Sequence, residues 1–458
     1  MNYEQALEFL SSRHTSIYRG LQRIRYVLEA LGNPQHSFRS VLITGTNGKG
    51  STAKMLSSIL QEAGYRVGCF TSPHLIDFSE RMTINGQGIS QAEVVAFTEQ
   101  IRTGPLTRLE HDRQTLQIEG TVSFFELVTA MAFLYFARHQ VDIAVLEVGI
   151  GGRLDATNTV DPLVSVITNV GLDHQAFLGT TIADITREKS AIIREHGQVV
   201  TGCQTPEALA VIEDACKIRG ATLYRTGVQL GEDELAFAQK SVPHTISSTG
   251  SLFSYFGLHG QYAGLSLPLV GRHQLANATI ALAVLELLAT QGFVVTEQAI
   301  RTGLAKVNHP GRLELIQADP RVVVDIAHNA MGAQAIADAL TSIFAYEKLI
   351  VVIGVLHDKD VEGILRPFLQ VADSLIFTSP HTTNRAETAT ATEQIARKVT
   401  ASADFRHYDQ WRIHEYVQEA LEQAYALAGE QDLICVTGSN YTVSEADLYI
   451  STKAPKQK

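Results

Sequence analysis

The chain has 458 residues, of which 45% are hydrophobic and 19% are charged, and its formal net charge is −11. This length allows two or three domains with sizeable cores. The acidic balance argues against a nucleic-acid-binding surface, which normally carries an excess of Lys and Arg. It does not exclude anionic small ligands, because their sites need only local positive charge and oriented N–H groups.

The chain contains four cysteines without CxxC spacing, so we expect a reducing compartment and neither a disulfide framework nor a zinc site. Residues 1–16 predict an amphipathic helix and no signal peptide, since no basic segment precedes an apolar one. We find no apolar run of about 18 residues that would predict a membrane span. We therefore expect a cytoplasmic monomer that binds neither membranes nor nucleic acids.

Strand and helix patterns alternate in the first part of the chain. Continuous apolar runs predict strands at 40–44, 67–70, 141–148 and 163–168, and helical patterns occupy 49–63 and 124–140. This alternation predicts an α/β fold with a P-loop-type, mostly parallel sheet that has helices on both faces.

The pattern changes between about 225 and 270, where alternating Gly, Ser and aromatic residues predict antiparallel strands or an irregular excursion. Helices are predicted at 272–292 and 296–306, and a second α/β series follows, with strands at 322–329, 349–356, 374–379 and 432–439. We therefore predict two domains, a larger one at 1–307 and a smaller Rossmann-like α/β domain at 308–458.

The motif GTNGKGS at 45–51 differs from the common phosphate loop, because Lys49 precedes Gly50 instead of following it. It lies between a predicted strand and a predicted helix, and its glycines allow backbone N–H groups to converge on an anion. The helix dipole, Lys49 and the hydroxyl of Ser51 favour the same ligand. A glycine-rich turn without a ligand is the alternative, but these coinciding features favour a nucleotide site.

Polar residues follow the predicted strands at their carboxyl edge, which faces the ligand crevice in such sheets. Glu147 ends one strand, Asp173 and His174 follow the next, and Ser72 lies on a loop before Pro73. A buried carboxylate is costly unless it is paired or binds a metal. Backbone capping by Glu147 and a purely structural His174 are the alternatives. Because Mg²⁺ prefers oxygen ligands, the role of His174 is left open by these residues alone.

Three further segments carry polar clusters. REKSAII (187–193) is predicted to begin a helical run, and there Lys189 is either functional or solvated. DIAHNAMGA (325–333) and VLHDKD (355–360) lie at strand ends in the second domain, and we expect them to close onto the nucleotide. Helix N-capping explains one Asp or Asn in each of these two clusters, but not the whole set.

Taken with these motifs, the lysine-shifted loop resembles the ATP site of the Mur ligase superfamily. The segments TSPHL, SERM, SFFE, EVGIGGRLDATN, LDH, EKSAI, GRHQLANA, PGRLE, DIAHN, GVLHDKD and VTGS extend the resemblance over nearly the whole chain. It is most similar to the folylpolyglutamate synthase/dihydrofolate synthase branch. Three positions depart from that pattern: Ala330 replaces a usual Pro, Ser190-Ala191 replaces Ala-Gly, and Asn440 replaces an apolar residue.

The resemblance implies roles for individual residues. The implied ATP-binding residues are Asn47, Gly48, Lys49, Gly50, Ser51, Asn277, Arg312 and Asp325. The implied Mg²⁺ ligands are Ser72, Glu147 and His174. The residues implied on the pterin side are Arg19, Gly20, Leu21, Ser123, Phe124, Phe125, Glu126, Leu154, Asp155 and Ala156. The implied catalytic residues are Lys49, Lys189, Asp325 and His328, and Lys189 matches a lysine that the family carbamylates.

The implied reaction is ATP-dependent amide ligation. ATP phosphorylates a carboxylate of a folate or of dihydropteroate, and the amine of L-glutamate attacks the acyl phosphate, releasing phosphate and ADP. Closure of the second domain, with Asp325 and His328 as candidates for coordinating it, would exclude water from the labile intermediate. Folylpolyglutamate synthase activity alone, another Mur-type acceptor, and a P-loop ATPase switch are the alternatives.

Overall fold

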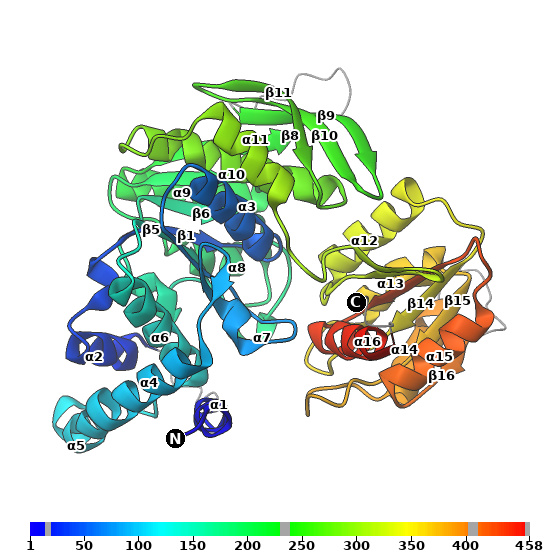
Figure 1. Ribbon diagram of the computed structural model, residues 1–458, viewed down its shortest axis with the longest axis horizontal. Coiled ribbons are helices and arrows are strands. Elements are labelled where there is room, and N and C mark those ends of the chain that lie inside the picture. Colours follow the sequence, from blue (N-terminus) through cyan, green and yellow to red (C-terminus); the bar gives the residue numbers. More distant parts are fainter. Residues whose placement is uncertain (14–19, 230–238, 402–410, 454–458) are drawn as a thin grey trace.

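The computed structural model describes residues 1–13, 20–229, 239–401 and 411–453. Two sheets organise these residues, one of eleven strands in the order β11-β10-β9-β8-β7-β6-β1-β5-β2-β3-β4 and one of six in the order β12-β13-β17-β14-β15-β16. Figure 1 shows them in two lobes that lie side by side. We call residues up to Lys306 the first lobe and residues from Glu314 onward the second lobe.

The centre of the larger sheet is parallel. Its parallel strands are β1 (Arg39–Thr44), β2 (Val67–Phe70), β5 (Ile143–Glu147), β6 (Val164–Ile167), β7 (Gln198–Thr201) and β8 (Thr222–Val228). Side chains alternate between the two faces of a strand. Accordingly, Leu42 of β1 lies in one hydrophobic core, whereas its neighbours Val41 and Ile43 lie in the core on the opposite face.

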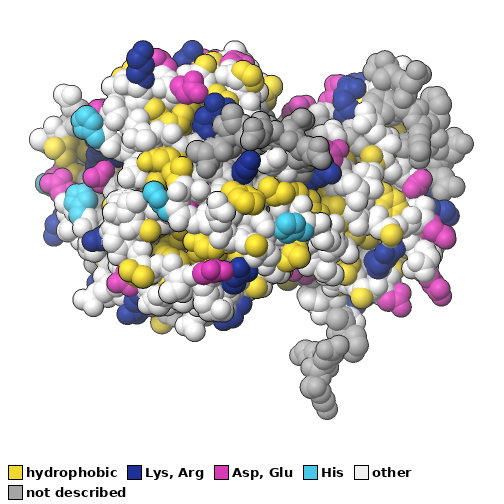
Figure 2. All heavy atoms as spheres, turned by 90° about the horizontal axis from the view of Figure 1, so that it is seen from above, with side chains coloured by type: hydrophobic (Ala, Val, Ile, Leu, Met, Phe, Trp, Pro, Cys, Tyr) yellow, Lys and Arg dark blue, Asp and Glu magenta, His cyan; other side chains and the backbone are white. Residues whose placement is uncertain are grey.

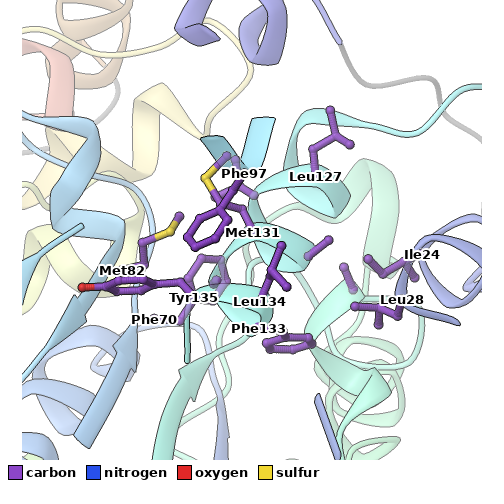
Figure 3. Packing of buried hydrophobic residues seen from close by; sticks show 14 of the residues in the cluster. Ile24, Leu28, Phe70, Met82, Phe97, Leu127, Met131, Phe133, Leu134 and Tyr135 are labelled. Carbon is purple, nitrogen blue, oxygen red and sulfur yellow. The ribbon is translucent and has the colours of Figure 1, made fainter. Parts of the chain in front are cut away.

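Helices therefore cover both faces. One core contains α1 (Tyr3–Ser11), α2 (Gln22–Ala30), α4 (Gln91–Ile101), α5 (Thr107–Leu116) and α6 (Phe124–Arg138). Figure 3 shows Met131, Phe133 and Leu134 of α6 at its centre. The opposite core contains α3 (Lys49–Glu62), α10 (Arg272–Ala289) and α11 (Glu297–Lys306). A third core contains α7 (Gln175–Leu178), α8 (Ile182–Ser190) and α9 (Pro206–Arg219).

Antiparallel strands extend the larger sheet at both edges. β9 (Gln239–Ser247), β10 (Gly250–Phe256) and β11 (Gln261–Leu267) pair antiparallel, as the alternating residues between 225 and 270 predict. At the other edge, β3 (Met82–Ile84) and β4 (Gln87–Gly88) form a hairpin that the sequence analysis did not predict. The first lobe also has the short helical segments η1 (Pro34–His36), η2 (Phe78–Arg81), η3 (Arg102–Leu106) and η4 (Ala156–Thr159).

The second lobe is a smaller α/β layer structure. Its strands are β12 (Glu314–Ala318), β13 (Arg321–Val324), β14 (Leu349–Ile353), β15 (Ser374–Phe377), β16 (Arg412–Ile413) and β17 (Leu433–Thr437), of which only the edge strand β12 pairs antiparallel among those described. Helices α12 (Ala330–Ile343), α13 (Val361–Val371) and α14 (Ala389–Ala401) cover one face. Helices α15 (Val417–Leu427) and α16 (Asn440–Lys453) cover the other.

The predicted fold class is confirmed, with differences at the ends of elements. The strand predicted at 322–329 already ends at Val324, because the backbone leaves the sheet at the buried carboxylate of Asp325. The predicted domain boundary near 308 falls between α11 and β12, and we keep a division at 307/308 as a proposal. On the face drawn in Figure 2, basic and acidic side chains are interspersed. Among the described residues, none of the helices combines the length and apolar character that crossing a membrane requires.

Candidate active site

The loop between β1 and α3 has the geometry of a phosphate loop. Gly48 caps α3 in the left-handed conformation, with φ 83°, and a Cβ atom there would lie 2.2 Å from Asn277 Oδ1. Residues that follow β6 support the loop from the side, since Asn169 Oδ1 accepts from Asn47 N at 2.8 Å and Thr168 Oγ1 donates to Asn47 O at 2.6 Å. The first turn of α3, whose N–H groups have no partners within the helix, therefore follows a loop that is held in place and capped by Gly48.

Lys49 folds back onto this loop. Its ammonium group donates to the carbonyl oxygens of Gly45 and Thr46, each at 3.1 Å. Burial lowers the pKa of Lys49, while the carboxylates of Glu147 and Asp173 raise it. The lysine is thus a partly desolvated cation at the loop, with two carbonyl partners that an arriving phosphate can replace.

Glu147 and Ser72 meet at the carboxyl edge of the sheet. Glu147 ends β5 and is 4% exposed, and its Oε2 accepts from Ser72 N at 2.9 Å. Backbone capping therefore accounts for Oε2 of Glu147. The other oxygen, Oε1, accepts no hydrogen bond from the described residues. Burial raises the pKa of Glu147, and the charge of Lys49 opposes that rise.

His174 lies at the same edge but does not join this pair. It has φ 50° at the start of α7, and its Nε2 lies 3.9 Å from Asp173 Oδ2. Burial lowers the pKa of His174 to about 4, so the imidazole is neutral at pH 7 and can donate a lone pair. Within the described ranges, no three His, Cys, Asp or Glu side chains are grouped to hold a metal ion. The predicted set of Ser72, Glu147 and His174 therefore remains a prediction.

Lys189 lies against the phosphate loop and not in solvent. Its ammonium nitrogen donates to Gly45 O at 2.7 Å, and the residue is 4% exposed. Burial and the charge of Lys49 lower the pKa of Lys189 to about 7. The prediction that a helix begins near 187 is wrong, because α8 ends at Ser190 and Lys189 lies in its last turn.

Loops of the second lobe reach this region, as predicted for the DIAHN and LHDKD segments. Asn329 and Asn47 exchange two amide hydrogen bonds of 3.1 and 3.0 Å. Lys359 Nζ lies 2.6 Å from Asp173 Oδ1, and His328 Nε2 lies 3.8 Å from Asp173 Oδ2. Burial alone would raise the pKa of Asp173, but His174 and His328, which are protonated at the low pH where this carboxyl titrates, and the charge of Lys359 hold it well below its usual range.

The remaining predicted ATP-binding residues lie close by. Asn277 faces Gly48, as the short Cβ distance shows. Asp325 accepts from Leu313 N at 2.9 Å and Ala327 N at 2.7 Å, and burial raises its pKa to about 6 against the opposing charge of Arg312. Arg312 keeps a buried Nε that lacks a partner among the described residues. Asp325 therefore fixes the segment that carries Arg312, whose guanidinium retains a free donor.

The predicted pterin-side segments are neighbours, although several of their side chains already have structural partners. Ser123 caps α6 and forms a capping box with Glu126. Arg23 links Glu126, at 3.3 Å, to the carbonyl oxygen of Gly20, at 3.5 Å. Leu21 is the N-cap residue of α2, and Arg19 lies outside the described residues.

The loop after β5 completes this region. A Cβ atom at Gly149 would lie 2.6 Å from the ring of Phe125, so Phe125 packs directly on the loop. Asp155, between Leu154 and Ala156, accepts from Ile150 N at 3.0 Å, Thr157 N at 3.0 Å and Thr157 Oγ1 at 2.5 Å. Its carboxylate therefore shapes the loop, and substrate contact by these residues stays a prediction.

Two side chains near the site, the partly buried His309 and the buried Arg81, were not predicted to act there. His309 Nδ1 lies 3.1 Å from Ser51 Oγ, and burial lowers the pKa of His309 well below its usual value. Arg81 donates from Nε to His74 Nδ1 at 2.7 Å and lies over the ring of Phe124, which is predicted to bind substrate, at 5.2 Å. Arg81 lies inside the SERM segment and His309 directly precedes the PGRLE segment, and these positions were the available signals.

Known proteins match this chain over nearly its whole length. The model of the Mur ligase middle domain matches residues 43–285, and that of the Mur ligase, glutamate ligase domain, matches residues 311–440. Dihydrofolate synthase/folylpolyglutamate synthase of Bacillus subtilis is 34% identical over 450 residues, which cover 97% of this chain and 98% of that protein.

Solved structures agree with these matches. Folylpolyglutamate synthase of Mycobacterium tuberculosis, complexed with ADP and AMPPCP, has a TM-score of 0.87 at 34% identity, with 99% of each chain covered. Escherichia coli FolC in complex with DHPP and ADP has a TM-score of 0.83 at 31% identity, also with 99% of each chain covered. A bifunctional folylpolyglutamate synthase/dihydrofolate synthase with Mn, AMPPNP and L-glutamate bound has a TM-score of 0.81 at 30% identity, with 98% of each covered.

Proposed function

The chain belongs to the folylpolyglutamate synthase/dihydrofolate synthase family of Mur ligases, and on this premise we propose how its residues carry out the reaction. The enzyme is an ATP-dependent ligase that joins L-glutamate to folates. The observation that carries the proposed site is a phosphate loop on which Lys49 and Lys189 both bond to Gly45, beside the Ser72–Glu147 contact.

ATP binds with its phosphates at the amino end of α3. The backbone N–H groups from Gly48 to Ser51 and the helix dipole attract the phosphate oxygens. Lys49 leaves its carbonyl partners and neutralises charge on the transferring phosphoryl group. Asn277, Arg312 and Asp325 complete the nucleotide site, and Arg312 Nε, which has no partner among the described residues, is available to donate to the ligand.

We propose a divalent metal ion at the sheet edge where Ser72 and Glu147 meet. Ser72, Glu147 and His174 would hold Mg²⁺, and Glu147 Oε1 is an oxygen with no competing hydrogen bond among the described residues. When bound, the ion supplies positive charge that stabilises the phosphoryl groups. His174 is ready to contribute because its imidazole is neutral at pH 7.

Lys189 has the properties that carbamylation requires. An amine must be neutral to attack CO₂, and a pKa of about 7 makes a large fraction of Lys189 neutral at physiological pH. The neutral amine nitrogen forms a bond to the carbon of CO₂ and releases one proton to solvent; together with the proton that the ammonium group has already lost, this turns a cation into a carboxylate. Incubation with labelled bicarbonate followed by chemical trapping should label Lys189; an unlabelled Lys189 in an active enzyme would contradict the modification.

The ligation then proceeds in two steps. A carboxylate oxygen of the acceptor attacks the γ-phosphorus of ATP and releases ADP, and the amine of L-glutamate attacks the acyl phosphate and releases phosphate. His328 Nδ1 lies 3.0 Å from Ile326 O, which can only accept, so the proton sits on Nδ1 and Nε2 is the acceptor for the glutamate amine. The second lobe excludes water from the anhydride.

We infer that the acceptor binds along Gly20, Leu21, the Ser123–Glu126 turn and the Leu154–Ala156 loop, and that dihydropteroate is accepted as well as folates. Phe125 against Gly149 supports an aromatic surface there for a pterin ring. We also propose that the enzyme acts as a monomer in the cytoplasm, where its four buried, unpaired cysteines remain reduced.

Substitution of Lys49 or Glu147 by Ala should abolish glutamate-dependent ADP release while circular dichroism and the thermal midpoint stay close to wild type. The assay uses dihydropteroate, tetrahydrofolate or neither acceptor, each with and without L-glutamate. Lys306→Ala is the matched control, because it removes an exposed lysine that pairs only with Glu62 among the described residues. Unchanged turnover in either variant would contradict the proposed site. Wild-type ADP release at the same rate with and without the acceptors would favour the ATPase switch.

A further inference from the structure

Asp173 is the residue of the first lobe on which the second lobe converges. Its carboxylate receives Lys359 Nζ at 2.6 Å and Asn329 Nδ2 at 3.3 Å, and His328 Nε2 lies 3.8 Å away. The side chains of Asp173 and Lys359 are 8% and 6% exposed. An acidic side chain of one lobe is therefore enclosed by donors from two loops of the other.

These contacts continue into the phosphate loop. The Asn329 side chain that donates to Asp173 also exchanges two hydrogen bonds with Asn47, and its Oδ1 accepts from Gly332 N at the start of α12. Asp173 and Asn47 thus hold the same side chain, which is itself fixed to a helix of the second lobe. A displacement of that lobe would move the partners of both residues together.

A local structural role does not account for this arrangement. Asp173 Oδ1 accepts from His174 N at 2.8 Å, which is an ordinary turn contact. That contact does not require a buried lysine from a distant loop, and burying two opposite charges costs desolvation energy that only close pairing repays. The Asp173–Lys359 pair can form only when the lobes are together, and each ion is hydrated when they separate.

We infer that Asp173 is a positioning residue for ligation, which fastens the second lobe onto the phosphate loop through Lys359 and Asn329. This inference rests on the proposed function, because it gives the ligase the closed geometry in which acyl phosphate and glutamate amine meet. Misplacement of reacting groups by about 1 Å can cost a factor of about 100 in rate. Loss of the fastening therefore acts mainly on kcat.

Asp173→Asn separates the local turn contact from the pairing with Lys359. Asn can still accept the hydrogen bond from His174 N, but it carries no charge to pair with Lys359. We expect kcat to fall about 100-fold while KM for ATP changes by less than about 5-fold. Lys359→Met should lower kcat by a similar factor. The kcat of the double variant should lie within about 3-fold of that of the less active single variant, because both substitutions remove the same interaction. Small-angle scattering should give all three variants a larger radius of gyration than wild type.

Asp358→Asn is the matched control, since Asp358 directly precedes Lys359 but pairs with Arg385 of the same lobe, with both side chains at least 40% exposed. It should keep kcat within about 2-fold of wild type. A kcat of Asp173→Asn near wild type, single effects that multiply in the double variant, or an unchanged radius of gyration would each overturn the inference. If Asp173→Asn does not fold, Lys359→Met decides by the same criteria. Failure of the proposed function is recognised separately, by wild-type enzyme that lacks glutamate-dependent ADP release.

Discussion

Gly48 shows how one residue type fixes the nucleotide loop. It combines a φ of 83° with contact to Asn277 so close that an added Cβ atom would lie 2.2 Å from Oδ1. Gly48→Ala must therefore move the loop or Asn277, and we expect it to weaken ATP binding at least about 10-fold and to lower the free energy of unfolding by about 1–3 kcal/mol. Titration calorimetry with an ATP analogue and urea unfolding measure the two effects.

Gly64 provides the control at the other end of the same helix. Its φ is 91°, but a Cβ atom there would meet nothing within 4 Å. Gly64→Ala thus adds backbone strain without a clash, so it should cost about 1 kcal/mol of stability and leave ATP binding unchanged. Equal effects of the two substitutions on ATP binding would mean that strain, and not contact with Asn277, explains the loss at Gly48.

The candidate site was predictable where its signal is local. Gly48, Lys49 and Glu147 each stand at a fixed place between a strand and the element after it, so pattern alone places them at one sheet edge. The pairing of Asp173 with Lys359 joins residues 186 positions apart, and nothing in either segment specifies the other. The role of Lys189 came from family resemblance, because a lysine in the last turn of a helix is ordinarily solvated.

At the scale of elements, apolar runs predicted the central strands β1, β2, β5 and β6, but they did not predict the interior strands β7 and β8. The run predicted at 40–44 is β1 at Arg39–Thr44, because both faces of this strand are buried and only its ends are polar. The hairpin of β3 and β4 escaped prediction, since Gln87 and Gly88 are exposed and carry no apolar pattern. Edge strands pair through backbone groups, which leave little trace in the sequence.

Glu286 of α10 holds the turn that connects β10 and β11. Its carboxylate accepts from three successive backbone N–H groups, those of Leu258, His259 and Gly260, at 2.9–3.0 Å, and from Gln239 Nε2 at 2.6 Å. Glu286→Gln would place an amide donor against these donors, so we expect a loss of about 3 kcal/mol in the free energy of unfolding. Urea unfolding measures the loss, and hydrogen exchange at residues 258–260 should accelerate.

Glu297→Gln is the comparison for that loss, because Glu297 forms an ion pair with Arg301 on the surface of α11, where the side chains are 55% and 35% exposed. Such pairs contribute about 0–1 kcal/mol. A loss at Glu286 no larger than at Glu297 would mean that the hairpin turn finds water or other partners, and that the buried carboxylate does not hold it.

For the whole molecule, partly buried imidazoles make stability depend on pH. Burial lowers the pKa values of His74, His174, His273 and His328 to about 4, and that of His309 well below its usual value. The unfolded chain takes up protons near pH 6.5, before the folded protein does, so the stability held above pH 6.5 is lost as pH falls toward 4.

Asp325 acts in the opposite direction, because a carboxyl whose pKa is raised to about 6 gains a proton in the folded protein first and so favours folding as pH falls. Burial also raises the pKa values of Glu147, Asp155 and Asp447, so these carboxyls act in the same direction as Asp325. We expect the five imidazoles to outweigh them, so that the free energy of unfolding falls by about 3 kcal/mol between pH 7 and pH 5. Urea titrations across this range measure the fall, and calorimetry at pH 5.5 in two buffers of different ionisation enthalpy should show net proton uptake on unfolding. A flat profile without proton uptake would mean that the imidazoles are hydrated in the folded protein, which would also remove the reason for treating His174 and His328 as neutral groups at the site.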